Sequence, residues 1–100
     1  MLKKYIEIIN KNRPNIAFVD YYSLHVNKEN TYCKICIPTK AKLVKKSGET
    51  VDVKTELYIS VGDTVKVCLS GDIDMNIDCH LVEINNINEN QLELVCKIFS

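Results

Sequence analysis

The alternation of apolar and polar residues between positions 51 and 69 limits the fold more than any other feature of this sequence. From Val51 to Val61 every second residue is apolar or threonine, and the residues between them are polar or tyrosine. Successive side chains of a strand point to opposite faces, so this stretch predicts a strand with one buried face. Gly62-Asp63 predicts a turn, after which the alternation resumes from Val65 to Leu69. Two such strands cannot bury their apolar faces alone, so further strands must cover them.

Most of the remaining chain shows strand patterns joined by short connections. We expect strands at residues 16–26, 32–37, 39–45, 51–61, 65–69, 73–84 and 92–98. Pro38 marks a bend between two of them, and a slip of parity at Leu81-Val82 predicts a β-bulge. The sequence therefore predicts a mostly β fold. We expect a small six- to seven-stranded antiparallel barrel, built as a meander from about residues 16–99.

The N-terminal segment has helical spacing instead, and we expect a helix over about residues 2–12. Its apolar stripe consists of Leu2, Tyr5, Ile6 and Ile9. Pro14 disfavours helical geometry at the residue before it, so the helix should end near Asn12. The stripe predicts that this helix either plugs the open end of the barrel or forms a contact between two copies. The protein is accordingly expected to be a monomer or a homodimer.

Composition places the chain among ordinary globular domains. One hundred residues, 46% hydrophobic and 26% charged, predict a single domain over residues 1–100. No apolar run approaches the roughly 20 residues that span a bilayer. Glu7, Asn10 and Lys11 interrupt any signal-peptide core, so we expect a cytoplasmic protein with no membrane partner. The five cysteines are odd in number and fall in predicted strands, which favours reduced thiols that act as small apolar side chains.

One pattern resembles a zinc site. Cys33-x-x-Cys36 together with Cys79-His80 supplies four residues of the types that bind zinc. However, positions 33 and 36 of one strand face opposite ways, and so do positions 79 and 80. We therefore interpret these cysteines as buried thiols and expect no metal and no cofactor.

A second pattern resembles a calcium loop. Residues 72–83 carry acidic or amide side chains at Asp72, Asp74, Asn76 and Asp78, with Glu83 at the twelfth position. Such a loop needs glycine at its sixth position, where this chain has the β-branched Ile77. Acidic residues on the wet face of a strand explain the same spacing.

Catalytic chemistry has little support in the sequence. His25 and His80 are the only histidines, and we interpret both as solvent-facing strand residues. The three glycines each mark a predicted hairpin turn, so there is no phosphate-binding loop. We expect no enzyme.

A basic face is the strongest candidate for ligand binding. The candidate residues on outward parity are Lys34, Lys40, Lys42, Lys54, Tyr32 and Tyr58. Lysines with aromatic side chains on a barrel face suit phosphates and stacked bases, as in a nucleic-acid module with an OB-like barrel. The alternative interpretation is a solvated face that protects an edge strand from aggregation. Residues 1–50 hold ten basic and four acidic side chains, and residues 51–100 hold three and nine. This asymmetry fits either an anion site or the pairing of basic with acidic strands.

Residues 57–99 resemble the C-terminal half of a PilZ domain. The similar stretches are Val61–Val67, then Ile77–Ile84, then Gln91–Leu94 with Ile98-Phe99. The resemblance implies a six-stranded barrel that binds cyclic di-GMP through Arg-x-x-x-Arg and a following Asp/Asn-x-Ser-x-x-Gly. The first motif is absent because Arg13 has no arginine four residues away in either direction. The second is absent because none of Ser23, Ser47, Ser60 and Ser70 has Asp or Asn two residues before it or Gly three residues after it.

The resemblance therefore implies a divergent member that has lost the nucleotide site and acts through contact with another protein. Nucleic-acid binding by the basic face is the alternative from a different class. A further alternative is cyclic-dinucleotide binding through non-standard residues, with Arg13 among the candidates.

Overall fold

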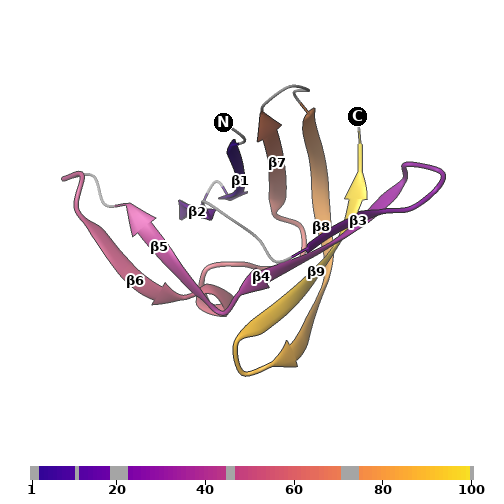
Figure 1. The fold of residues 1–100 in the computed structure, drawn as a ribbon. Coiled ribbons are helices and arrows are strands. Elements are labelled where there is room, and N and C mark those ends of the chain that lie inside the picture. The colour runs from indigo at the N-terminus through magenta and orange to yellow at the C-terminus, as the bar shows by residue number, and fades with distance from the viewer. Residues whose placement is uncertain (1–2, 11, 19–22, 45–46, 71–74, 100) are drawn as a thin grey trace.

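A computed structural model describes residues 3–10, 12–18, 23–44, 47–70 and 75–99, and places all of its strands in one antiparallel sheet (Figure 1). The strands are β1 (Lys3–Asn10), β2 (Arg13–Phe18), β3 (Ser23–Val26), β4 (Tyr32–Pro38), β5 (Lys40–Val44), β6 (Thr50–Lys54), β7 (Thr64–Ser70), β8 (Met75–Asn88) and β9 (Gln91–Ile98). A short 3-10 helix, η1 (Thr55–Leu57), follows β6. The predicted mostly β, antiparallel character is confirmed. No helix among the described residues is long and apolar enough to cross a membrane.

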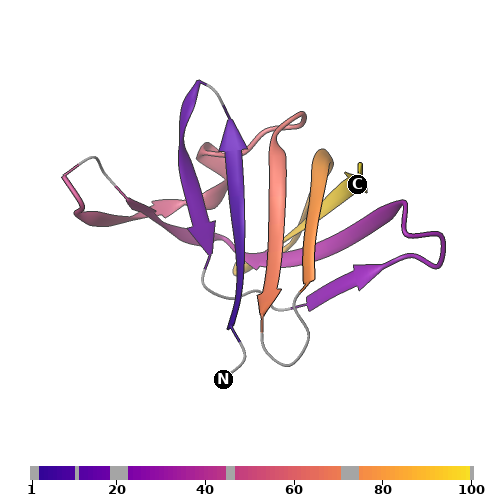
Figure 2. The ribbon, with the colours of Figure 1, turned by 90° about the horizontal axis from the view of Figure 1, so that it is seen from above.

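The order of the strands in the sheet differs from their order in the chain. Neighbours run β3-β4-β9-β8-β7-β1-β2-β5-β6, so β3 and β6 are edge strands and the predicted closed barrel is wrong. The predicted meander is also wrong, because β1 pairs with β7, β2 with β5 and β4 with β9. The β3–β4 and β5–β6 hairpins project on opposite sides of the molecule (Figure 2).

The sheet is strongly curled because two strands near its opposite ends are consecutive in the chain. Only Thr39 separates β4 from β5, and the predicted bend at Pro38 is confirmed. The Thr39 amide donates to the carbonyl of Asn90 at 3.1 Å, and its carbonyl accepts from the Thr55 amide at 2.8 Å. The buried Thr55 hydroxyl donates to the Pro38 carbonyl at 2.9 Å. These bonds fix the bend by tying it to the β8–β9 turn and to η1.

One face of the curled sheet encloses a single core. Its buried apolar residues are Ile6, Ile8, Ile16, Cys33, Ile35, Ile37, Ala41, Leu43, Ile59, Val65, Val67, Cys79, Leu81, Leu92, Leu94 and Cys96. They alternate with exposed or half-buried residues along β4, β5, β7 and β9, as the period of two predicts. Each large aliphatic side chain that is buried stabilises the fold by about 1.5–3 kcal/mol before entropy is subtracted.

The predicted N-terminal helix is wrong, because residues 3–10 form strand β1 in the middle of the sheet. Ile6 and Ile8 are both buried, whereas Ile9 is half-buried, which is the period of a strand. Seven residues of β1 pair with β7 on one side, and β2 pairs on the other. β-Branched isoleucines suit this position, and the two ladders outweigh the weak helical spacing of a short segment. The predicted helical plug of the barrel and the predicted helix-mediated dimer are therefore wrong. Leu2 lies outside the described residues.

The predicted strand over residues 51–61 is too long. β6 ends at Lys54, and the apolar Leu57 and Val61 are 69% and 63% exposed. A turn replaces the end of the strand, because the Asp63 amide donates to the Ser60 carbonyl at 3.1 Å and Gly62 takes a φ of 102°. Glycine adopts this backbone region without steric cost, so the predicted turn at Gly62-Asp63 is confirmed.

Asp63 holds this turn against two distant strands. Its carboxylate accepts from the Asn10 side-chain amide at 2.7 Å and from the Ser60 backbone amide at 2.9 Å. Its backbone carbonyl accepts from the Leu81 amide of β8 at 2.9 Å. A buried carboxylate needs such donors, which explains how Asp63 can be 2% exposed.

Two further sequence predictions differ in their boundaries. The predicted strand over residues 16–26 corresponds to β2 and β3, and residues 19–22 between them lie outside the described residues. β8 corresponds to the predicted strand over residues 73–84 but continues to Asn88. The β-bulge predicted at Leu81-Val82 is confirmed, since the register with β9 shifts between Leu81 and Glu83.

Candidate functional site

The structure divides the predicted basic face between two hairpins. Tyr32 and Lys34 lie exposed on β4, whereas Lys40, Lys42 and Lys54 lie exposed on the β5–β6 hairpin. These hairpins project on opposite sides of the molecule (Figure 2). The candidates therefore form two separate groups.

The lysine group on β5–β6 lacks the stacking residue that the sequence suggested. Lys40 lies directly opposite Lys54, while Lys42 lies opposite Asp52 and forms a 3.0 Å ion pair with it. Both partners of that pair are largely exposed, so it adds little stability. Tyr58 is half-buried and packs against the core. Arg13 begins β2, and its side chain lies outside the described part of the structure.

The β3–β4 hairpin borders a cavity of about 280 Å³. The lining residues are His25, Val26, Asn27, Tyr32, Cys33, Lys34 and Val95. Two of the predicted ligand residues, Tyr32 and Lys34, are among them. Val26 and Tyr32 are 37% and 44% exposed, so apolar surface meets solvent at this end of the molecule.

A network centred on Asn27 fixes the hairpin that carries this surface. The Asn27 side-chain oxygen accepts from the amides of Thr31 and Tyr32 at 2.8 and 3.0 Å. Its side-chain nitrogen donates to the Thr31 hydroxyl at 2.8 Å. Asn30 takes a φ of 57°, a left-handed conformation that asparagine tolerates. Residues 27–30 therefore belong to a hydrogen-bonded polar turn that joins β3 to β4 next to Val26 and Tyr32.

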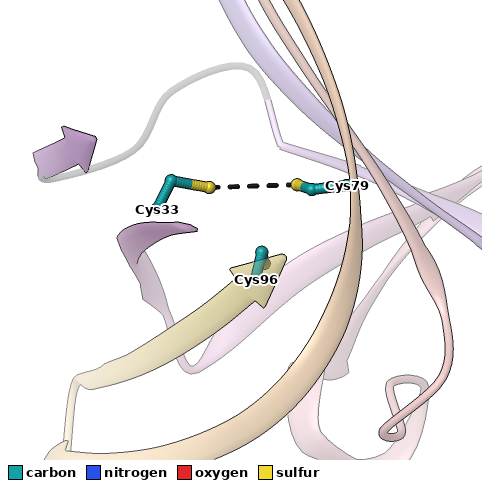
Figure 3. Close-up of side chains that lie close together, drawn as sticks. All are labelled: Cys33, Cys79 and Cys96. Atoms are coloured by element: carbon teal, nitrogen blue, oxygen red, sulfur yellow. Dashed lines mark hydrogen bonds between the residues drawn. The ribbon is translucent and has the colours of Figure 1, made fainter. Parts of the chain in front are cut away.

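Three buried cysteines from three strands converge inside the core (Figure 3). Cys33 lies on β4 and Cys96 on β9, directly opposite each other, and Cys79 lies on β8. All three are at most 1% exposed, and their sulfurs lie within 4.8 Å of one another. The sulfurs of Cys33 and Cys79 are 3.9 Å apart, and that of Cys79 is 3.4 Å from the Val65 carbonyl oxygen.

The sequence pattern grouped these cysteines wrongly. Cys36 is half-buried on the opposite face of β4 from Cys33, and His80 is exposed and stacks on Phe99 with ring centroids 4.3 Å apart. The four-residue zinc pattern is therefore not assembled, as expected from parity. Cys96, and not Cys36 or His80, is the third residue that lies with Cys33 and Cys79. Its inward parity was readable, but the pairing of β4 with β9 that places it opposite Cys33 was not.

Hydrogen bonding among the three sulfurs separates their affinities for protons. Hydrogen bonds from Cys79 and then Cys96 lower the pKa of Cys33 to about 4, against the opposite effect of burial. The hydrogen bond to Cys33 raises the pKa of Cys79 to about 12, and it raises the pKa of Cys96 as well. In the cluster, here defined as Cys33, Cys79 and Cys96, the titrations of the three thiols are therefore linked to one another.

The remaining sequence candidates lie on strands where the structure describes them. His25 and His80 are both exposed on strands, as predicted. Asp72 and Asp74 of the calcium-like pattern lie outside the described residues. Asp78 and Glu83 lie on β8, so this part of the pattern is a strand and not a loop.

No protein-family model, curated protein or solved structure matches this chain. The resemblance to a PilZ domain therefore depends on the sequence of residues 57–99.

Proposed function

We propose that this protein is a non-enzymatic binding module that acts through contact with another protein, as a divergent PilZ-like adaptor would. The observation that carries the proposal is the exposed apolar surface of Val26 and Tyr32 beside the cavity of the β3–β4 hairpin. Exposed apolar side chains around a cavity are a common feature of interaction sites. Such a surface requires no catalytic group.

The edge position of β3 suggests how the partner binds. β3 ends the strand order, so within the described residues one of its sides has no neighbouring strand. An extended segment of a partner can add to such an edge through backbone hydrogen bonds. Alternate side chains of that segment would then face the cavity, which selects an apolar anchor.

Charge adds a second preference. Lys34 lines the cavity, and Lys97 of β9 lies directly opposite Tyr32. An acidic side chain next to the apolar anchor would therefore be favoured in the partner segment. The occupant that we propose is an extended protein segment with an apolar anchor and a neighbouring acidic residue.

Selection from a displayed library of extended peptides tests this proposal. Selected peptides should contain an apolar residue beside an acidic one, and their binding should shift the backbone amide resonances of residues 23–34. Tyr32→Ala should weaken binding about tenfold or more, since aromatic anchors contribute about 2 kcal/mol or more at such sites. Leu57→Ala truncates an exposed apolar residue on η1 and serves as the matched control.

The control variant should bind the peptides as the wild type does. Peptides that bind Tyr32→Ala and Val26→Lys as tightly as wild type would place the contact elsewhere. A library that yields no binder would count against the β3 edge as a docking site.

Anion binding by the β5–β6 hairpin is a second candidate, favoured by one observation. Lys40 and Lys54 are exposed, directly opposite each other, and like charges in that position are unfavourable without a counterion. Retention on a single-stranded DNA column that falls steeply with salt would support this candidate, because phosphate contacts release counterions. Lys54→Glu should abolish that retention. A rise in melting temperature with cyclic di-GMP would instead support a cyclic-dinucleotide site.

A further inference from the structure

The cluster of Cys33, Cys79 and Cys96 is a group of potential metal ligands that the proposed binding surface does not use. The three residues come from neighbouring strands β4, β9 and β8, and all point into the core (Figure 3). In a flat sheet, side chains two strands apart would be separated by about 10 Å. The curl of the sheet brings the sulfurs of Cys33 and Cys79, on β4 and β8, to 3.9 Å instead.

This spacing matches a metal-thiolate centre. Zinc-sulfur bonds are about 2.3 Å long, so angles between tetrahedral and trigonal values require sulfurs about 3.8–4.0 Å apart. The Cys33–Cys79 separation falls in that range, and all three sulfurs lie within 4.8 Å of one another. Side-chain movements of less than an ångström would complete the arrangement. A disulfide needs sulfurs about 2.05 Å apart, which is much closer than any metal-bridged pair.

We propose that the cluster binds one divalent thiophilic ion of the zinc group through the sulfurs of Cys33, Cys79 and Cys96. The ligands in the described residues are sulfurs alone, which suit soft ions and exclude the oxygen-seeking calcium and magnesium. Three thiolates around a divalent ion leave a residual charge of about −1, the smallest that a common thiophilic ion gives here. All three ligands are buried, and a small net charge keeps the free-energy cost of burying the site low.

Metal binding in the cluster would have a consequence for stability. Because the three sulfurs come from separate strands, binding links β4, β9 and β8 and should stabilise the folded state.

Refolding the full chain with cadmium under a phosphine reductant tests the proposal. Cadmium replaces zinc at thiolate sites and gives an ultraviolet sulfur-to-metal charge-transfer band. We expect one ion per chain, with cadmium magnetic resonance that reports three sulfur ligands. The melting temperature should rise by roughly 10 °C or more when the free ion exceeds its Kd about a hundredfold. Zinc should displace cadmium and remove the band.

Variants identify the ligands. Cys33→Ala, Cys79→Ala and Cys96→Ala should each weaken cadmium binding at least about a hundredfold. Cys36→Ala and Cys68→Ala are the matched controls, since both residues are unbridged and half-buried outside the cluster, and they should bind as the wild type does.

Three results would overturn the proposal. The first is wild-type protein that takes up no cadmium on refolding. The second is a resonance that reports fewer than three sulfur ligands, which decides the matter even if a cluster variant fails to fold. The third is binding that survives Cys79→Ala or disappears in Cys36→Ala.

Discussion

Ile8 and Ile9 provide a direct test of the central strand, because they are the same residue type on opposite faces of β1. Ile8 is 2% exposed and lies opposite Ile16 of β2 and Val65 of β7, whereas Ile9 is half-buried opposite Thr64. Ile8→Ala should therefore lower the free energy of unfolding by about 2–5 kcal/mol. Ile9→Ala should cost about 1 kcal/mol or less, since less of its side chain leaves water on folding.

Urea denaturation followed by circular dichroism measures both values, since the chain has no tryptophan to follow by fluorescence. A loss of 3 kcal/mol corresponds to a fall in melting temperature of roughly 12–24 °C for a domain of this size. In the helical interpretation Ile9 belongs to the buried stripe and Ile8 does not, so the order of the costs would reverse. A loss for Ile9→Ala that equals or exceeds the loss for Ile8→Ala would refute the placement of β1.

Two further perturbations address the buried polar groups. Asp63→Ala leaves the Asn10 side chain and the Ser60 amide without their acceptor, so it should destabilise the fold by about 1–3 kcal/mol in denaturation, whereas the exposed Asp52→Ala should change stability little. The raised pKa values of Cys79 and Cys96 mean that the folded state keeps protons which the unfolded state releases, so stability in reductant should fall above about pH 9. This fall in stability should be smaller in Cys96→Ala than in wild type. Equal falls in the two proteins would contradict a raised pKa for Cys96. The lowered pKa of Cys33 acts in the opposite direction. The stability that it contributes is lost as the pH falls through about 4.

Parity along each strand could be read from the sequence, but the partners of each strand could not. The inward faces of β4, β5, β7 and β9 follow from alternation, and the bulge in β8 follows from the slip of parity. The pairing of β1 with β7 depends on contacts between distant segments, which a local pattern does not report. Residues 2–12 fit a helical template through the spacing of Ile6 and Ile9 and a strand through the spacing of Ile6 and Ile8, and tertiary pairing decides between them.

The candidate site shows the same division. Tyr32 and Lys34 were identified from outward parity, and their side chains do line the cavity. Tyr58 has the same parity in the sequence, but the chain leaves the strand at Thr55, so that parity no longer applies. The cluster required knowledge that β4 and β8 flank β9, and the spacing of cysteines in the sequence carries no such information.

The position of β1 between β2 and β7 has a consequence for synthesis of the chain. β1 precedes both of its partners in the chain, so during synthesis it can form a hairpin with β2, yet its second partner begins only at Thr64. At ordinary rates of translation this interval lasts several seconds. Throughout it, the free side of β1 offers unpaired backbone groups next to Ile6 and Ile8, which is the type of edge that recruits other chains. We therefore expect the nascent chain to depend on holding chaperones in this window, and its long-range strand pairings to make the completed chain fold slowly.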